Sequence, residues 1–446
     1  MNEYVASNPY TCSADDLTLA PFAGRQTAFA RLRQQFIDPP RKGALLVLGR
    51  HRIGKTALLR AFDVAFDETF VGVYVNLRDL TLQSEDEWWL SLAQAITERL
   101  IERAFTLHRL IDLSPPGDDV RTWFTQMYLP PVLTLVRPFR RIVLLADDAD
   151  ALLDAIAAGR LAADTVTFLR DLTDMHPRLY VTLALDSAYE SRVSDLQPLV
   201  RPIDMIRLTH LNQDEVSWLL REPVAGRYRL DDAALEAAWR LTGGEPSFVQ
   251  ALGCILYRRF EDGLMAAQVT TEDIKQVAGQ VFTLTADDLG QSWETLNFHE
   301  QQALRAISQL QYAHPLSPID AATIAHWLAD SDDPIDATAV SATMRSLEYR
   351  EMVRLTPEGV ALTSDLLHRW LLERAYPAAL TAVRRTPAAA EGSPALTRRN
   401  RGLRLALLVV LLVMLIVGVL LLTTLSNLPR DEFLIPPEPT VTLVGE

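Results

Sequence analysis

The chain has 446 residues, of which 49% are apolar and 22% are charged, so a wholly disordered or fibrous protein is excluded. Its length favours about three domains. The net charge of −14 provides no whole-chain attraction for nucleic acid. Because the chain has only two cysteines, a disulfide scaffold and a four-cysteine zinc site are also excluded.

Short apolar runs alternate with longer amphipathic stretches between residues 43 and 187. The apolar runs predict buried strands, and the stretches between them predict helices. The strands are expected at 44–48, 71–76, 141–146 and 179–185, and the helices at 55–66, 85–105, 119–136 and 163–173. This alternation is typical of a parallel sheet with helices on both faces. We therefore predict an α/β domain over residues 1–205.

The segment between the first predicted strand and helix carries the strongest chemical signal. Residues 49–56 read Gly-Arg-His-Arg-Ile-Gly-Lys-Thr and fit the phosphate-loop pattern G-x-x-x-x-G-K-[ST] of P-loop NTPases. The glycines let backbone N–H groups face phosphate oxygens, while the lysine supplies a cation and the threonine a hydroxyl for Mg²⁺. We predict that ATP or ADP contacts these residues: Gly49, Arg50, His51, Arg52, Ile53, Gly54, Lys55, Thr56 and Ala57.

Two acids close the third predicted strand. We expect Asp147 to hold Mg²⁺ together with Thr56, and Asp148 to position the attacking water. Asp148 and Lys55 are then the predicted catalytic residues. Since an aspartate is one methylene shorter than a glutamate, we expect slow ATP hydrolysis.

Helical patterns dominate after residue 208. They are expected at 213–221, 231–241, 247–261 and 271–281, and they predict a helical lid subdomain over residues 206–285. Short helices and two strands around a Thr-Pro-Glu-Gly turn predict a winged-helix domain over residues 286–376. Between residues 291 and 376 there are six basic and twelve acidic side chains, a balance that disfavours nucleic acid as a partner.

The C-terminal end has a different composition. Residues 377–404 are rich in Ala, Pro and Thr and predict a linker, whereas residues 405–425 are apolar and uncharged. A helix of that length rises about 31 Å, enough to span a bilayer, so we predict a transmembrane helix with the lipid bilayer as partner. Four arginines just before the run favour a cytoplasmic N-terminal bulk and an extracytoplasmic tail at 426–446. The predicted localisation is therefore the cytoplasmic membrane, as a single-pass tail-anchored protein.

In this order, the motifs resemble the STAND branch of P-loop ATPases, a bacterial and archaeal group related to AAA+ and origin-recognition-like ATPases. The resemblance covers residues 8–376 and includes an N-terminal motif at 8–10 and 21–25 and a Thr-Gly-Gly-Glu-Pro motif at 242–246. The family's N-terminal motif usually ends in Gly-Arg-Glu, whereas this chain has Gln26. The resemblance implies three further nucleotide contacts, which are Gly24, Arg25 and Pro246.

The resemblance also implies a switch controlled by ATP and ADP that opens to self-associate or to engage a protein partner. One departure is that the fourth strand ends in Asp186-Ser187 without an arginine, so Ser187 is the predicted polar sensor of the γ-phosphate. Any arginine that completes the site could come from Arg192, Arg201 or a neighbouring subunit. Two alternatives stay open: a membrane-tethered, DNA-associated ATPase of the origin-recognition-like kind, and a nucleotide-binding scaffold with little hydrolysis.

Overall fold

The computed structural model describes residues 8–11, 24–37, 43–80, 84–102, 119–136, 140–329 and 337–375. The chain divides into two compact units, residues 1–381 and 382–446, and every described residue belongs to the first.

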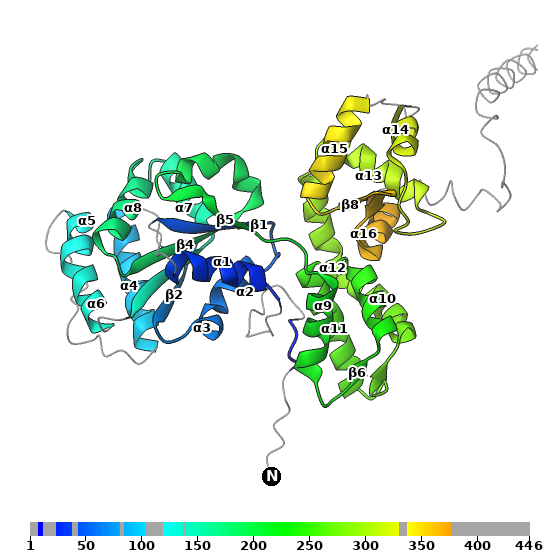
Figure 1. Cartoon of the computed structure of the whole chain (residues 1–446), viewed down its shortest axis with the longest axis horizontal. Coiled ribbons are helices and arrows are strands. Elements are labelled where there is room, and N and C mark those ends of the chain that lie inside the picture. The colour runs from blue at the N-terminus through cyan, green and yellow to red at the C-terminus, as the bar shows by residue number, and fades with distance from the viewer. Residues whose placement is uncertain are drawn as a thin grey trace, which may run out of the picture. The chain divides into compact units, whose positions relative to one another are not determined.

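A parallel sheet organises the N-terminal half, as predicted, and it has five strands rather than the four expected (Figure 1). Its strands are β1 (Ala44–Gly49), β2 (Phe70–Asn76), β3 (Arg141–Asp147), β4 (Leu179–Asp186) and β5 (Val200–Arg207), in the order β2-β3-β4-β1-β5. Gly49 pairs with Asp186, and Asn76 pairs with Asp147. Because the strands are parallel, their carboxyl ends bring the phosphate loop and the acidic residues to one edge of the sheet.

Helices cover both faces of the sheet, which confirms the α/β class. On one face, α1 (Gln26–Ile37), α2 (Lys55–Arg60) and α3 (Phe62–Ala65) pack through an aromatic cluster around Phe36 and Phe62. The other face carries α4 (Glu85–Glu102), α5 (Val120–Thr122), η1 (Trp123–Tyr128), α6 (Leu129–Leu135), α7 (Ala149–Ala157) and α8 (Thr165–Met175). Successive residues of a strand point to opposite faces of the sheet, so alternate residues of the strands belong to the hydrophobic cores on its two faces.

Strand β5 was not predicted, and its composition explains why. It contains Arg201, Pro202 and Asp204, so its sequence lacks the apolar run of the central strands. It lies at the edge of the sheet and pairs only with β1 within the described chain. An edge strand tolerates proline and charge because one of its sides needs no ladder partner.

The C-terminal half is helical and shares one hydrophobic core. It contains α9 (Gln213–Arg221), η3 (Glu222–Val224), β6 (Arg229–Leu230), α10 (Asp232–Thr242), α11 (Pro246–Glu261), β7 (Gln268–Val269), α12 (Thr271–Glu294), α13 (Phe298–Leu310), α14 (Ala321–Ala329), α15 (Ala337–Tyr349), β8 (Val353–Thr356), β9 (Gly359–Leu362), α16 (Asp365–Trp370) and η4 (Leu371–Ala375). Strands β8 and β9 form an antiparallel pair around the predicted turn. Helix α12 continues through residues 285 and 286, where a domain boundary was expected; that boundary stays a prediction.

The described residues contradict the predicted localisation in a cytoplasmic membrane. Across the described ranges, no helix combines the length and the apolar character needed to cross a bilayer. The longest described helix, α12, has 24 residues, but charged side chains such as Glu272, Asp273 and Lys275 interrupt it. The predicted linker at 377–404, span at 405–425 and tail at 426–446 lie outside the described residues.

Candidate functional site

The phosphate loop connects β1 to α2 at the carboxyl edge of the sheet. Gly54, the residue before α2, has φ +97°, and a Cβ placed on it would meet nothing within 4 Å. A Cβ on Gly49 would instead lie 2.6 Å from Ile53 Cγ2. The two glycines therefore serve different needs: Gly54 permits a left-handed turn beside open space, and Gly49 permits close packing inside the loop.

Lys55 lies almost buried at the start of α2, with 8% of its surface exposed. Its Nζ donates to the carbonyl oxygens of Gly49 at 2.8 Å and Arg50 at 2.9 Å, and to Asp186 Oδ2 at 3.0 Å. The three donors of the ammonium group are thus directed at three acceptors. Asp186 was not among the predicted site residues.

Thr56 and Asp147, the two predicted metal ligands, lie in direct contact. Thr56 Oγ1 donates to Asp147 Oδ2 at 2.6 Å, and Tyr74 Oη donates to the same oxygen at 3.0 Å. The guanidinium of Arg60 lies 4.7 Å from the centre of the Tyr74 ring. A hydroxyl beside a carboxylate suits Mg²⁺, which takes oxygen ligands and keeps several from water and phosphate. In the described part of the chain, no group of three or more His, Cys, Asp and Glu side chains could hold a metal ion.

Asp148 is the residue before α7 and adopts a left-handed conformation with φ 51°. Burial, reinforced by the neighbouring Asp147, raises the pKa of its carboxyl above the usual value, and Arg78 opposes that rise. Arg78 Nε lies 3.6 Å from Asp148 Oδ2, and Arg78 also bonds to Asp150. Asp148 keeps a third of its side chain exposed at the sheet edge, where it can accept a hydrogen bond from water.

Arg25 supports the loop from the N-terminal side. Its guanidinium donates to the carbonyl oxygens of Ile53 at 2.8 Å and Thr209 at 2.5 Å, and its backbone N–H donates to Glu215 Oε1 at 2.8 Å. Burial lowers the pKa of Arg25, although nearby glutamates oppose the change. Gly24 has φ +69°, and a Cβ on it would clash with Glu215. This segment therefore joins the loop to the start of the helical half.

The arginines of the phosphate loop contact residues far along the chain. Arg50 donates to Glu245 Oε2 at 2.5 Å and to the Arg350 carbonyl oxygen at 2.8 Å. His210 Nε2 lies 2.7 Å from the same oxygen of Glu245. Burial alone would raise the pKa of Glu245, but Arg50 and His210 hold it below its usual value. Glu245 thus carries a buried negative charge between two basic side chains.

Arg52 forms the second long-range contact of the loop, an ion pair with Asp288 of α12. We call the contacts of Arg50 and Arg52 with Glu245, Asp288 and Arg350 the loop latch. Glu245, Asp288 and Arg350 were not predicted as site residues. No sequence motif predicts their contacts with the loop. They are separated from their partners by 195, 236 and 300 residues in the sequence, and only folding brings them into contact.

The remaining predicted residues make no described side-chain contact with Lys55, Thr56 or Asp147. Pro246 begins α11, next to Glu245, while His51 and Ala57 are exposed. Ser187 begins η2 (Ser187–Leu196) directly after Asp186, and it is Asp186 whose side chain contacts Lys55. The two arginines left open by the sequence have local partners, since Arg192 bonds to a carboxylate of α7 and Arg201 to one of β5.

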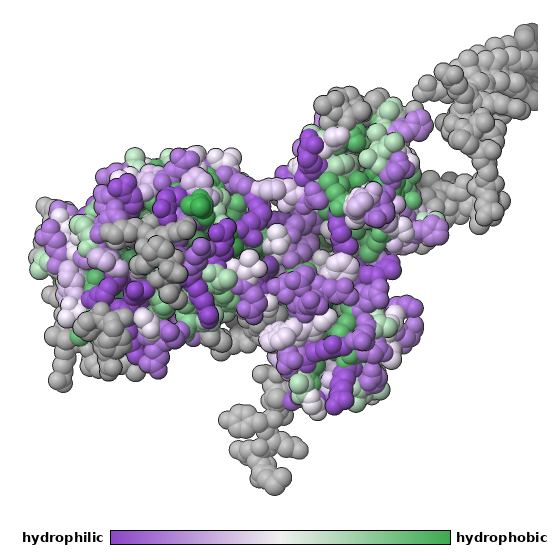
Figure 2. Space-filling view, in the orientation of Figure 1, coloured by the Kyte–Doolittle hydropathy of each residue, from purple (hydrophilic) through white to green (hydrophobic). Residues whose placement is uncertain are grey.

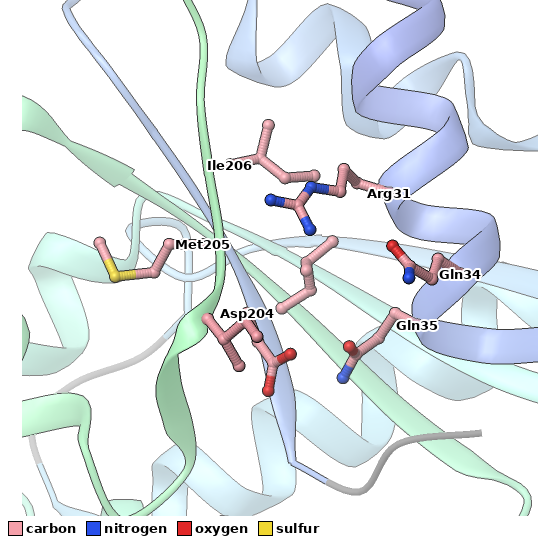
Figure 3. A pocket seen from close by; sticks show the side chains of 8 residues that line it. Arg31, Gln34, Gln35, Asp204, Met205 and Ile206 are labelled. Atoms are coloured by element: carbon pink, nitrogen blue, oxygen red, sulfur yellow. The ribbon is translucent and has the colours of Figure 1, made fainter. Parts of the chain in front are cut away.

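A crevice elsewhere on the sheet does not belong to this site. Figure 3 shows Gln35 of α1 facing Asp204 of β5, with Arg31 and Gln34 beside it. Asp204 is buried and accepts a hydrogen bond from Arg201 Nε at 2.5 Å. The crevice shares no residue with the phosphate loop and belongs to the packing of α1 on the edge strand.

Fold and loop geometry together define the α/β fold of a P-loop NTPase. No family model and no curated protein matches the chain. Among solved structures, a Walker-type ATPase of Pyrococcus abyssi is 16% identical, with 81% of this chain and 98% of that chain covered and a TM-score of 0.54. The ORC2 protein of Aeropyrum pernix, solved as ADPNP–ADP complexes, is 14% identical, with 80% and 93% covered and a TM-score of 0.50. At these identities the likeness shows the fold.

Proposed function

We propose that the chain is a slow ATPase of the STAND type, in which ATP and ADP control self-association or engagement of a protein partner. The loop latch carries this proposal, because two arginines of the phosphate loop bond to the helical half. A bound phosphate would compete with these carboxylates for the guanidinium groups. The nucleotide state would then change how firmly the two halves are joined.

The site residues take the following parts in this proposal. The loop amides and Lys55 would bind phosphates, Thr56 and Asp147 would hold Mg²⁺, and Asp148 would orient the attacking water. When bound, Mg²⁺ would neutralise charge on the phosphate oxygens. Direct contact between Thr56 and Asp147 supports their pairing, and the partial exposure of Asp148 supports its access to water. Gly24, Arg25, Pro246 and Ser187 complete the proposed nucleotide surroundings.

Three domains follow one another along the chain in this proposal. Residues 1–205 would be the ATPase domain, residues 206–285 a lid and residues 286–376 a winged helix. Helices α13 to α15 followed by the β8–β9 pair support the last assignment. The loop latch joins the ATPase domain to both later parts, through Glu245 in one and Asp288 and Arg350 in the other.

The first test is to identify the nucleotide that co-purifies with the full chain. The protein is denatured, and the released nucleotide is separated by chromatography, with Lys55→Ala as the control for the loop. We expect near-stoichiometric ADP from the native chain and little from the variant. An empty site that turns over added ATP rapidly would contradict a switch, and a chain that binds no nucleotide would refute the ATPase proposal.

A nucleotide-binding scaffold with little hydrolysis is the second candidate. It is favoured by the contact of Asp148 with Arg78, which competes with water for the carboxylate that the reaction would need. Single-turnover measurements distinguish the two functions. Retention of intact ATP over many hours would favour the scaffold, and conversion of bound ATP to ADP would favour the slow ATPase.

A further inference from the structure

The end of β4 places a carboxylate beside the phosphate loop. In the sheet, β4 lies between β3 and β1, and Asp186 is paired in register with Gly49. Asp186 Oδ2 lies 3.0 Å from Lys55 Nζ, while its Oδ1 accepts the Ala188 N–H at 3.0 Å. One oxygen therefore caps η2, and the other contacts the lysine that would bind phosphate.

This contact competes with a phosphate for Lys55. The other two acceptors of Nζ are backbone carbonyl oxygens of Gly49 and Arg50, which are fixed by the loop. Among the described contacts of Lys55, only Asp186 offers an acceptor on a side chain. A phosphate oxygen that binds Lys55 must therefore displace or share the Asp186 contact.

The displaced carboxylate cannot move far, because the cap of η2 holds its other oxygen. Its negative charge stays close to the phosphates, in a site that already contains Asp147 and Asp148. The nearby cations already have carboxylate partners. Lys55 is shared with Asp186, and Arg78 is paired with Asp148 and Asp150. Arg50 and Arg52 are paired in the loop latch. Repulsion grows with the charge on the ligand, so a triphosphate is disfavoured more than a diphosphate.

We propose that Asp186 is a specificity-determining residue that disfavours the terminal phosphate, so that the site prefers a nucleoside diphosphate over the triphosphate. This inference rests on the proposed nucleotide-binding function and deepens it. It assigns the discrimination to Asp186 rather than to Ser187, the sensor predicted from the sequence.

The test compares the dissociation constants of ADP and of a slowly hydrolysed ATP analogue, measured by calorimetry with Mg²⁺ on the full chain. Asp186→Asn and Asp186→Ser both remove the charge while keeping a side chain that can cap η2. We expect the ratio of the triphosphate to the diphosphate constant to fall about tenfold in both variants. Asp186→Glu, which keeps the charge, is expected to retain most of the native ratio.

The control is Asp195→Asn, which removes an exposed charge from the same element η2 and should leave the ratio unchanged. One outcome would overturn this inference alone. In it the native chain binds both ligands, but the ratio of the triphosphate to the diphosphate constant is the same in the Asp186 and Asp195 variants. Weaker binding of both ligands by the same factor would also overturn it, since Asp186 would then only position Lys55. A native chain that binds neither ligand would overturn the proposed function as well.

Discussion

Tyr74 contributes a hydrogen bond to Asp147 from the neighbouring strand β2. Its hydroxyl shares an acceptor oxygen with Thr56, and burial raises the pKa of Tyr74, so the phenol stays protonated as a donor. The bond fixes one oxygen of a carboxylate that is only 2% exposed. Tyr74 is therefore a positioning residue for the proposed Mg²⁺ ligand.

Replacing Tyr74 with Phe tests this positioning. Loss of a hydrogen bond to a charged group should reduce the gain in nucleotide affinity produced by Mg²⁺ by about tenfold. Affinity in the presence of a chelator should change little. Tyr180→Phe on β4 is the matched control, because it removes a hydroxyl from the same sheet outside the described contacts of Asp147. Equal Mg²⁺ dependence in all three proteins would contradict the role of Tyr74.

At the scale of the elements, the turn between α10 and α11 depends on Gly244. Its φ is +78°, and a Cβ there would lie 2.1 Å from the Leu211 carbonyl oxygen. Gly244→Ala should lower the free energy of unfolding by about 3 kcal/mol, from the left-handed conformation together with the clash. Gly226→Ala is the control, since Gly226 has φ +85° but open space around it, and should cost about 1 kcal/mol. Urea denaturation measures both, and equal losses would show that the clash is relieved elsewhere.

Helix α16 carries a buried histidine that should make stability depend on pH. Burial lowers the pKa of His368, which contacts the Ser308 carbonyl oxygen at 3.1 Å, while Asp365 opposes the shift. Below the unfolded pKa of about 6.5, the unfolded chain gains a proton more readily than the folded chain. Stability is therefore lost as pH falls through 6.5 towards the folded pKa.

Thermal unfolding at pH 7.5, 6.5 and 5.5 tests this dependence on His368. The loss on acidification should be smaller in His368→Gln than in the native chain, whereas His299→Gln, at an exposed position of α13, should behave as the native chain does. An identical pH dependence in His368→Gln and the native chain would assign the effect to other groups.

The sequence predicted those parts of the fold and site whose signal is local. The residues of the phosphate loop are adjacent in the chain, and Asp147-Asp148 ends an apolar run, so both could be predicted as candidate site residues. Asp186 was overlooked because an acid at a strand end is common, and its meaning depends on Lys55, 131 residues away. Strand β5 was missed because an edge strand can carry charges and proline without an apolar run.

At the scale of the whole molecule, the loop latch makes nucleotide exchange depend on the helical half. Asp288→Asn weakens the ion pair that would compete with a bound phosphate for Arg52, so release of bound ADP should become about fivefold slower, in line with a change of about 1 kcal/mol. Stopped-flow release of a fluorescent ADP analogue measures the rate. Asp287→Asn, its exposed neighbour on α12, is the matched control. Equal release rates in the two variants would show that Asp288 does not compete with the nucleotide for Arg52.

The described surface seen in Figure 2 is largely hydrophilic, and the apolar side chains gather in three cores, two on the sheet and one in the helical half. The helical core extends from α9 to η4 without a break at α12. We therefore expect α9 to η4 to move as one body when the latch opens.

Backbone conformation adds a consequence for engineering. Five described non-glycine residues have positive φ. Leu316 lies apart from the site, whereas the other four belong to the loop and its support, the acidic pair or the contacts of the helical half, namely Arg25, Arg52, Asp148 and Glu351. A directed-evolution screen for heat resistance would favour glycine or asparagine at these positions, since both relax a left-handed backbone. The same changes would remove side chains that hold the loop. Selection for heat resistance should therefore favour glycine or asparagine at these four positions, whereas selection for nucleotide control should favour the present side chains.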